Sequence, residues 1–165
     1  MVFSVFRNIN QFAKRWQVLD ITAIFFARYI PYLMVIFLFF YAIYISNIYL
    51  FFYAVLSGLF SRFIINELVH LFYKEQRPTE LEETKILIPI PKNSSFPSGH
   101  SSFFSGISFF LIFYNIYLAI IFIVLSFLIG IARVFCGVHW FRDILGGFVA
   151  GSVSAVITYY LLIIL

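Results

Sequence analysis

Long apolar runs separated by short polar breaks constrain the fold of this chain more than any other feature. The runs cover residues 21–45, 48–73, 98–114, 116–135 and 141–165. Their lengths suit α-helices that cross a hydrocarbon layer about 30 Å thick. Hydrophobic residues make up 63% of the chain and charged residues only 11%, which leaves more apolar surface than a soluble domain can bury. We therefore predict an all-α integral membrane protein, a bundle of about five transmembrane helices.

Two segments lie outside the predicted spans. Residues 1–19 carry apolar side chains at helical spacing among basic ones, which is typical of an amphipathic helix in the membrane interface. Residues 74–97 hold most of the acidic residues and four of the five prolines, which indicates a loop. We interpret residues 1–165 as a single membrane-embedded domain. With this number of spans, the loop, the N-terminal segment and residues 133–143 would lie on one side of the membrane.

The few polar residues gather at the ends of the predicted spans in three clusters. These are Arg77-Pro78, Phe96–Ser102, and Arg133 with His139 and Asp143. Taken singly, an arginine or histidine at a span end is often only an interfacial anchor or a helix cap. Taken together, the clusters form a set of groups suited to binding and transferring a phosphoryl group.

Two arginines and a helix start are the candidate phosphate-binding groups. Arg77 and Arg133 offer planar guanidinium groups that match phosphate oxygens bidentately and stay charged at any working pH. Ser98 and Gly99 stand where a predicted helix begins, and free backbone N–H groups at such a position bind anions. Gly99 also allows a ligand to approach the backbone closely.

The candidate catalytic residues are two histidines and an aspartate. His139 and Asp143 are four residues apart, so they share a helix face and the carboxylate can bond one imidazole nitrogen. The other nitrogen is then free to attack phosphorus and form a phosphohistidine, which water hydrolyses. We expect His100 to protonate the departing lipid oxygen and then to deprotonate the attacking water.

These residues resemble the three-part signature of the phosphatidic acid phosphatase type 2 superfamily. The second part, Pro-Ser-Gly-His, is complete at residues 97–100. The third part is Ser-Arg, five residues, His, three residues, Asp, and it is matched at residues 132–143 except that Ala132 replaces the serine. The first part is Lys, six residues, Arg-Pro; here Arg77-Pro78 is present, but His70 stands at the lysine position. A long composite pattern of this kind is far more specific than a short motif.

The resemblance implies a membrane enzyme that removes phosphate from a lipid. It implies the same roles for the residues already named: phosphate binding for Arg77, Ser98, Gly99 and Arg133, nucleophile for His139, its partner Asp143, and acid His100. His70 would donate to a phosphate oxygen as the family lysine does, with a charge that titrates near neutral pH. Lys74, one turn further along, is the alternative cation.

Within the superfamily, three stretches look most like bacterial undecaprenyl-diphosphate phosphatases: residues 9–13, 25–29 and 92–96. The resemblance therefore favours conversion of undecaprenyl diphosphate to undecaprenyl phosphate. Lipid A 1-phosphatases and phosphatases of phosphatidylglycerophosphate or phosphatidic acid share the same chemical groups and stay open as alternatives. A non-enzymatic alternative is a transport protein or a protein that binds anionic lipids with the same pocket.

No cofactor, metal site, nucleic-acid partner or obligate protein partner is predicted. The loop carboxylates Glu75, Glu80, Glu82 and Glu83 are typical of solvated charge rather than of a metal site. The resemblance implies a bacterial inner membrane location with the site facing the periplasm or exterior. The charges disagree, since nearly all Lys and Arg residues lie on the predicted side of the site, and the positive-inside rule assigns such a side to the cytoplasm.

Overall fold

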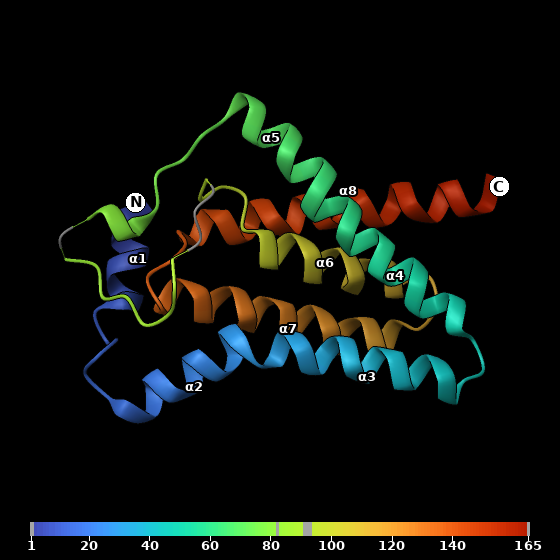
Figure 1. The fold of residues 1–165 in the computed structure, drawn as a ribbon, viewed down its shortest axis with the longest axis horizontal. Helices are drawn as coiled ribbons and strands as arrows, with labels where there is room; N and C mark the ends of the chain where they lie inside the picture. Colours follow the sequence, from blue (N-terminus) through green and yellow to red (C-terminus); the bar gives the residue numbers. More distant parts are fainter. Residues whose placement is uncertain (1, 82, 91–93, 165) are drawn as a thin grey trace.

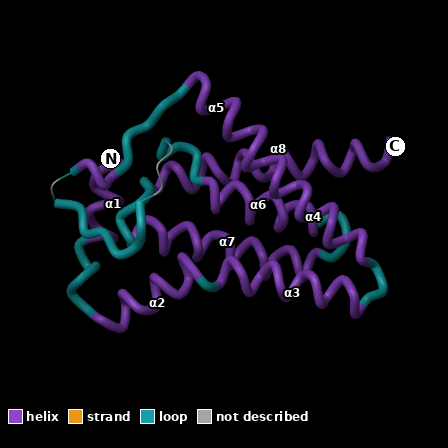
Figure 2. The backbone as a smooth tube through the Cα atoms, in the orientation of Figure 1, coloured by secondary structure: helices purple, strands orange, loops and turns teal. Residues whose placement is uncertain are grey.

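The computed structural model describes residues 2–81, 83–90 and 94–164, and every regular element in that part is a helix (Figures 1 and 2). The all-α prediction is confirmed. Glu82 and residues 91–93 of the predicted loop lie outside the described residues. The elements are α1 (Val2–Asn10), α2 (Gln17–Arg28), α3 (Ile30–Tyr44), α4 (Ile48–Phe60), the π-helix η1 (Ser61–Ile65), α5 (Asn66–Phe72), the 3-10 helix η2 (Pro78–Glu80), α6 (Gly99–Leu111), α7 (Ile116–Phe135) and α8 (Phe141–Ile164).

Four helical stretches have the length and composition of membrane spans. Three are continuous, at Ile48–Phe72, Ile116–Phe135 and Phe141–Ile164. The fourth is the pair α2 and α3, bent by 45° at Tyr29, with Pro31 at the start of α3. A proline there has no N–H to donate and favours a break in the helix. The fifth predicted span is α6, whose 13 residues reach only about 20 Å, so it is shorter than a full crossing.

The N-terminal segment differs from the single helix expected over residues 1–19. Helix α1 ends at Asn10, and α2 begins at Gln17. Between them, Lys14 adopts a left-handed conformation with φ of 59°. Its backbone N–H donates to the carboxylate of Asp20, at 3.0 Å from Oδ1. This side-chain acceptor stabilises a turn that no apolar pattern predicts.

The polar segments of the molecule gather at one end. Figure 1 shows α1, the loop between α5 and α6, and the α7–α8 turn at the left of the view, while the α3–α4 turn and the C-terminus lie at the right. The predicted common side for the N-terminal segment, the loop and residues 133–143 is therefore seen in the structure.

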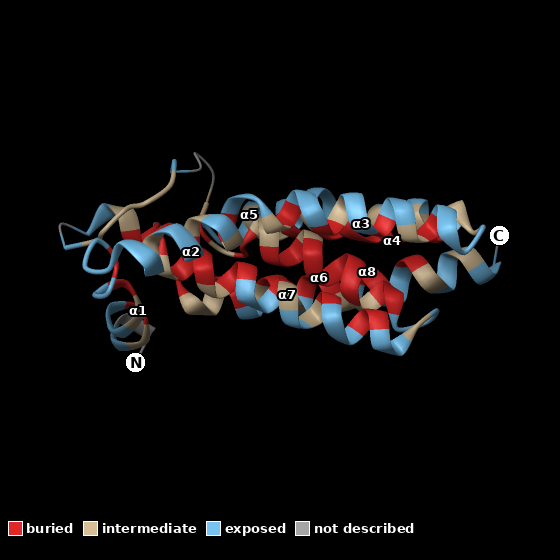
Figure 3. Cartoon of the chain, turned by 90° about the horizontal axis from the view of Figure 1, so that it is seen from below, coloured by how far each residue is buried: buried red, intermediate tan, exposed pale blue. Residues whose placement is uncertain are grey.

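Helix α6 lies at the centre of the bundle because small residues let its neighbours approach closely. A Cβ atom at Gly151 of α8 would lie 2.0 Å from Ser105 Oγ, and one at Gly58 of α4 would lie 2.7 Å from the Phe103 carbonyl oxygen. Small residues allow such close contact between helices in a membrane. Figure 3 shows the resulting buried residues along the middle of the molecule.

Buried serines join these helices through their hydroxyl groups. Ser57 Oγ donates to Gly106 O at 3.0 Å, and Ser105 Oγ donates to Gly147 O at 3.0 Å. Ser154 Oγ donates to Ser57 O at 2.6 Å. Polar groups removed from water need such partners, so these contacts fix α4, α6 and α8 relative to one another.

Candidate active site

The candidate site lies at the loop end of the bundle, where residues far apart in sequence meet. Arg77 comes from the loop before η2, and His100 from the first turn of α6. Arg133 comes from the last turn of α7, His139 from the α7–α8 turn and Asp143 from the first turn of α8. The Arg77 guanidinium contacts the His139 ring, and His100 lies close enough to Arg133 and His139 for their charges to interact. The three clusters predicted from the sequence are thus neighbours.

One carboxylate oxygen of Asp143 holds the His139 ring in place. Asp143 Oδ2 lies 3.2 Å from His139 Nδ1, the pair that the four-residue spacing predicts. The same oxygen accepts from Ser95 Oγ at 2.5 Å and from the Trp140 backbone N–H at 2.9 Å. Asp143 is fully buried, so these contacts restrict its carboxylate to one orientation.

Arg77 contacts the His139 ring close to both of its nitrogens, with Nη1 also 3.5 Å from Nδ1. Its Nη1 donates to the Val138 carbonyl oxygen at 2.7 Å and lies 3.3 Å from His139 Nε2, while its Nη2 donates to Ser94 O at 3.0 Å. A guanidinium only donates and an ionised carboxylate only accepts. The Asp143 carboxylate beside Nδ1 therefore favours the tautomer with the proton on Nδ1 and the lone pair on Nε2.

His139 is held in its neutral form. Burial, followed by the positive charges of Arg133 and Arg77, keeps the pKa of His139 well below its usual value. Its side chain is almost completely enclosed, with 2% of the residue exposed. A histidine with a lowered pKa is unprotonated at neutral pH, so a lone pair is available at Nε2.

The start of α6 is tied directly to the start of α8. The Ser98 N–H donates to the Asp143 carbonyl oxygen at 3.0 Å, and Ser98 Oγ caps α6 by accepting from the Ser101 N–H at 3.5 Å. The first N–H groups of a helix have no partner within it. Gly99 has no side chain, and the Arg62 guanidinium lies beside it: a Cβ atom at Gly99 would be 3.4 Å from Arg62 Nη1.

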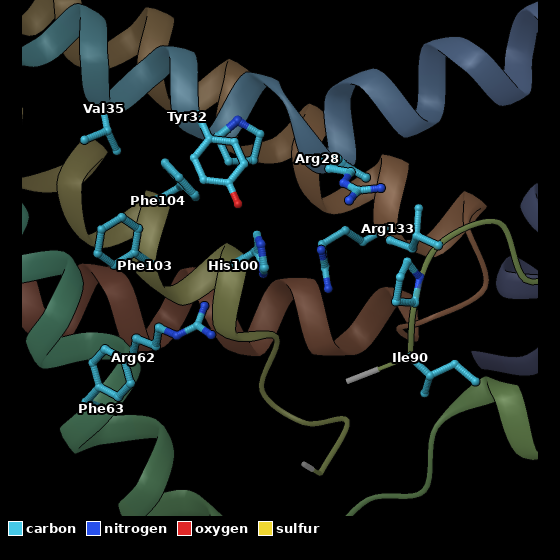
Figure 4. Close-up of a pocket in the computed structure, with 14 residues that line it drawn as sticks. Arg28, Tyr32, Val35, Arg62, Phe63, Ile90, His100, Phe103, Phe104 and Arg133 are labelled. Carbon is cyan, nitrogen blue, oxygen red and sulfur yellow. The ribbon is translucent and has the colours of Figure 1, made fainter. Parts of the chain in front are cut away.

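Arg62 and Arg28 are site-facing residues that were not among the predicted site residues. Both line a cavity of about 610 Å³ beside His100 and Arg133, and Figure 4 shows their side chains around it. Their sequence signal was present, since both are charged residues inside apolar runs, which mark functional sites by default. No short motif includes them, so only the folded chain relates them to His100.

Of the predicted site residues, His70 contacts a carboxylate of its own helix and Lys74 lies exposed at the surface. His70 Nδ1 lies 3.4 Å from Glu67 Oε1, one turn earlier in α5. Its Nε2 is buried without a hydrogen-bond partner among the described residues. Lys74 is exposed. The part of the chain that the structure describes contains no cluster of three or more His, Cys, Asp or Glu side chains arranged to hold a metal ion.

Helix α1 supports the site from outside the membrane spans, a role that was not expected. Asn10 is buried, and its Nδ2 donates to the carbonyl oxygens of Lys85 and Phe135, each at 2.8 Å. Its Oδ1 accepts from the Lys85 N–H at 2.9 Å. Phe6 packs edge-on against Trp140, with ring centroids 5.0 Å apart. The helix therefore joins the loop, the end of α7 and the residue that follows His139.

Comparison with known proteins identifies a matching family and similar bacterial proteins. The profile of the PAP2 superfamily matches residues 47–163. Undecaprenyl-diphosphatase BcrC of Bacillus subtilis is 28% identical over 93% of this chain and 80% of its own length. A protein of Bacillus licheniformis named bacitracin transport permease protein BcrC is 27% identical over 94% of this chain and 77% of its own length.

Two solved structures share the fold. LpxE of Aquifex aeolicus aligns with a TM-score of 0.75 and 26% identity, covering 96% of this chain and 94% of its own. A transmembrane PAP2-type phosphatidylglycerolphosphate phosphatase of Bacillus subtilis aligns with a TM-score of 0.69 and 24% identity, covering 97% of this chain and 85% of its own.

Proposed function

Since this chain belongs to the PAP2 superfamily and is a multi-pass membrane protein, we propose that it is a lipid phosphatase that works through a phosphohistidine on His139. The observation that carries the proposal is the setting of the His139 ring. Nδ1 lies 3.2 Å from Asp143 Oδ2, and Nε2 lies 3.3 Å from the Arg77 guanidinium. A neutral imidazole oriented by a carboxylate, with its lone pair beside a phosphate-binding group, is suited to attack phosphorus.

The first step transfers the phosphoryl group to the enzyme. Arg77, Arg133 and the N–H groups at the start of α6 bind the phosphate oxygens and stabilise the charge of the transition state. The Nε2 lone pair forms a bond to phosphorus while the bond between phosphorus and the lipid oxygen breaks. His100 donates a proton to that oxygen, and a bound phosphate dianion favours the protonated form that this requires.

The second step returns the enzyme to its starting state. Water attacks the phosphorus of the phosphohistidine, and His100, now neutral, takes up a proton from it. The bond between phosphorus and Nε2 breaks, Nε2 regains its lone pair, and inorganic phosphate leaves. The Asp143 carboxylate stabilises the imidazole throughout by accepting from Nδ1. Every step uses side chains of this chain, and we propose that none requires a metal ion.

Undecaprenyl diphosphate is the substrate we propose, to be converted to undecaprenyl phosphate. The likeness to the undecaprenyl-diphosphatase of Bacillus subtilis over 93% of the chain supports it, as does a cavity with both apolar and cationic walls beside His100. Lipid A is the second candidate, because lipid A 1-phosphatases of this superfamily share the same chemical groups. We propose a bacterial inner membrane location with the site facing the periplasm or exterior.

Phosphate release by the purified protein tests both mechanism and substrate. We expect the parent protein in detergent with EDTA to release phosphate from undecaprenyl diphosphate faster than from lipid A, phosphatidylglycerophosphate or phosphatidic acid. His139→Ala should lose at least about 1,000-fold in kcat, because it removes the nucleophile. Arg15→Ala, at an exposed position before α2, is the matched control and should retain parental activity.

Three outcomes would contradict three different parts of the proposed function. Release that EDTA abolishes would contradict the metal-free mechanism. Activity retained in His139→Ala would contradict the assignment of the nucleophile. Binding of undecaprenyl diphosphate without phosphate release from any lipid would favour a binding or transport protein, the function in the name of the Bacillus licheniformis relative.

A further inference from the structure

The cavity beside His100 has an unusual combination of walls. Its volume is about 610 Å³, and most of the described lining residues are apolar. Among them stand three arginines, Arg28, Arg62 and Arg133, together with His100 and Tyr32. In the view of Figure 4, His100 lies between Arg62 and Arg133, and the Tyr32 hydroxyl points into the same space. The cavity therefore has a cluster of cationic side chains in walls that are otherwise largely apolar.

The positive charge of this cavity is not balanced by the described residues. No carboxylate is among those that line it. The three ion pairs in the described part of the chain involve His70, His139 and Arg142 as the basic partners, and none involves an arginine of the cavity. Clustered cations repel one another in a medium of low dielectric constant, so such a cluster is stabilised by an anionic ligand.

The cavity holds more cations than a single phosphate requires. Arg77 contacts His139 directly, and Arg133 is buried close to His100 and His139. These two arginines and the start of α6 already provide donors for one phosphoryl group at His139. Arg62 and Arg28 remain as additional cations in the same cavity.

Local backbone structure directs Arg62 towards the start of α6. It lies in η1, the π-helical turn between α4 and α5, where the Asn66 N–H bonds the Ser61 carbonyl oxygen. Such turns change the direction of side chains within a helix and occur frequently at functional sites. The Arg62 guanidinium carbon is also 5.5 Å from the Phe63 ring centroid. This contact and the approach to Gly99 orient the guanidinium beside His100.

The chemistry of a lipid diphosphate places its second phosphate on this side of His100. The terminal phosphate is transferred to His139, and the bridging oxygen, which leaves, must be next to His100. The phosphate that stays on the lipid then lies beyond His100, away from His139. Arg62 lies near His100, and the apolar wall continues from there along α3 and α6.

We propose that Arg62, assisted by Arg28, binds the non-transferred phosphate of a diphosphate lipid and thereby selects diphosphates over monophosphates. The inference rests on the proposed function, because it concerns the same reaction. The lipid chain attached to that phosphate continues past Tyr32, Val35 and Phe104 towards the bilayer. Arg62 is thus a substrate-binding residue for one substrate class, whereas Arg77 and Arg133 serve every phosphate that is cleaved.

Two lipids that differ by one phosphate test this assignment. Diacylglycerol pyrophosphate and phosphatidic acid with the same acyl chains should be compared by kcat/KM. We expect the parent protein to prefer the diphosphate and Arg62→Gln to lose roughly 10- to 100-fold on the diphosphate alone, the effect of removing a hydrogen bond between charged groups. Arg62→Lys should recover part of the loss, and Arg28→Gln should show a smaller loss in the same direction.

The controls separate this inference from folding and from the proposed function. Arg15→Gln removes an exposed positive charge outside the cavity and should leave the ratio of the two kcat/KM values unchanged. If thermal unfolding shows that Arg62→Gln is poorly folded, the kcat/KM values of Arg62→Lys and Arg28→Gln on the two lipids test the inference instead. An equal loss on both lipids, an unchanged ratio, or a parent protein without preference for the diphosphate would overturn the inference. A parent protein that cleaves neither lipid nor undecaprenyl diphosphate would contradict the proposed function itself.

Discussion

At the scale of single residues, the site depends on a histidine kept neutral inside a positively charged environment. The positive charges of Arg133 and Arg77 both oppose the protonation of His139. Asp143 compensates by accepting from Nδ1, and it is fixed in turn by Ser95 and Trp140. The sequence predicted the pairing of His139 with Asp143 through their spacing. It did not predict Ser95, because a serine contact across 48 residues leaves no pattern in the chain.

The lowered pKa of His139 predicts a pH dependence of stability. Unfolding restores an ordinary pKa of about 6.5, so below that pH the unfolded chain binds a proton that the folded chain excludes. The stabilisation is fully present above about pH 6.5 and declines as the pH falls towards the folded pKa, by at most about 1.4 kcal/mol per pH unit. We expect the melting temperature to fall more between pH 7.5 and 5.5 for the parent than for His139→Gln.

His139→Gln is the suitable comparison because glutamine does not titrate and both proteins retain His100. The difference between their melting curves therefore reports on His139 together with the Asp143 carboxylate that it contacts. An equal decline in both proteins would mean that His139 has an ordinary pKa in the folded state and would remove the argument for a neutral nucleophile.

At the scale of elements, apolar runs predicted where helices lie better than where they end or bend. The runs located α4 with α5, α7 and α8. They missed the π-helical turn at residues 61–65, which changes no apolar pattern, and they extended the third run beyond Leu111, where α6 ends. Apolar residues continue past that point, but the chain leaves the helix in a turn before Asn115, whose side chain caps α7. Composition reports the membrane environment, whereas helix ends depend on caps.

The contacts of Asn10 predict that α1 is required for the order of the active-site loop. Asn10→Leu keeps a similar volume but leaves two carbonyl oxygens and the Lys85 N–H without partners. We expect a destabilisation of about 2–4 kcal/mol, faster proteolysis within residues 74–97 and lower phosphate release, measured by thermal unfolding, limited proteolysis and the phosphatase assay. Gln11→Leu is the adjacent control, since Gln11 is exposed and its side chain bonds only the nearby Asn8 carbonyl. Parental protease resistance in Asn10→Leu would contradict this role.

At the scale of the whole molecule, charge and family likeness disagree about orientation. The loop end carries Arg7, Lys14, Arg15, Lys85 and Arg142, while the turns at Ser46-Asn47 and Asn115 carry no cation. Lys92 belongs to the same loop but lies outside the described residues. The structure gives part of this charge local partners, because Arg142 pairs with Glu75 and Lys85 Nζ donates to the Gln11 carbonyl. The positive-inside rule counts the Lys and Arg residues in short loops. It does not separate out the cations that the folded domain uses for its own contacts.

Accessibility of engineered cysteines in right-side-out membrane vesicles tests the orientation directly. The native Cys136 is buried, and burial raises the pKa of its thiol to about 12, so it stays unreactive towards maleimides, which need the thiolate. Glu83→Cys places a thiol on the exposed loop, and Tyr117→Cys places one at the opposite end, where the native side chain is 79% exposed. With the site facing the exterior, an impermeant maleimide should label Glu83→Cys in sealed vesicles and Tyr117→Cys only after permeabilisation. The reverse pattern would mean that the positive-inside rule holds here and that the phosphatase works on the cytoplasmic side.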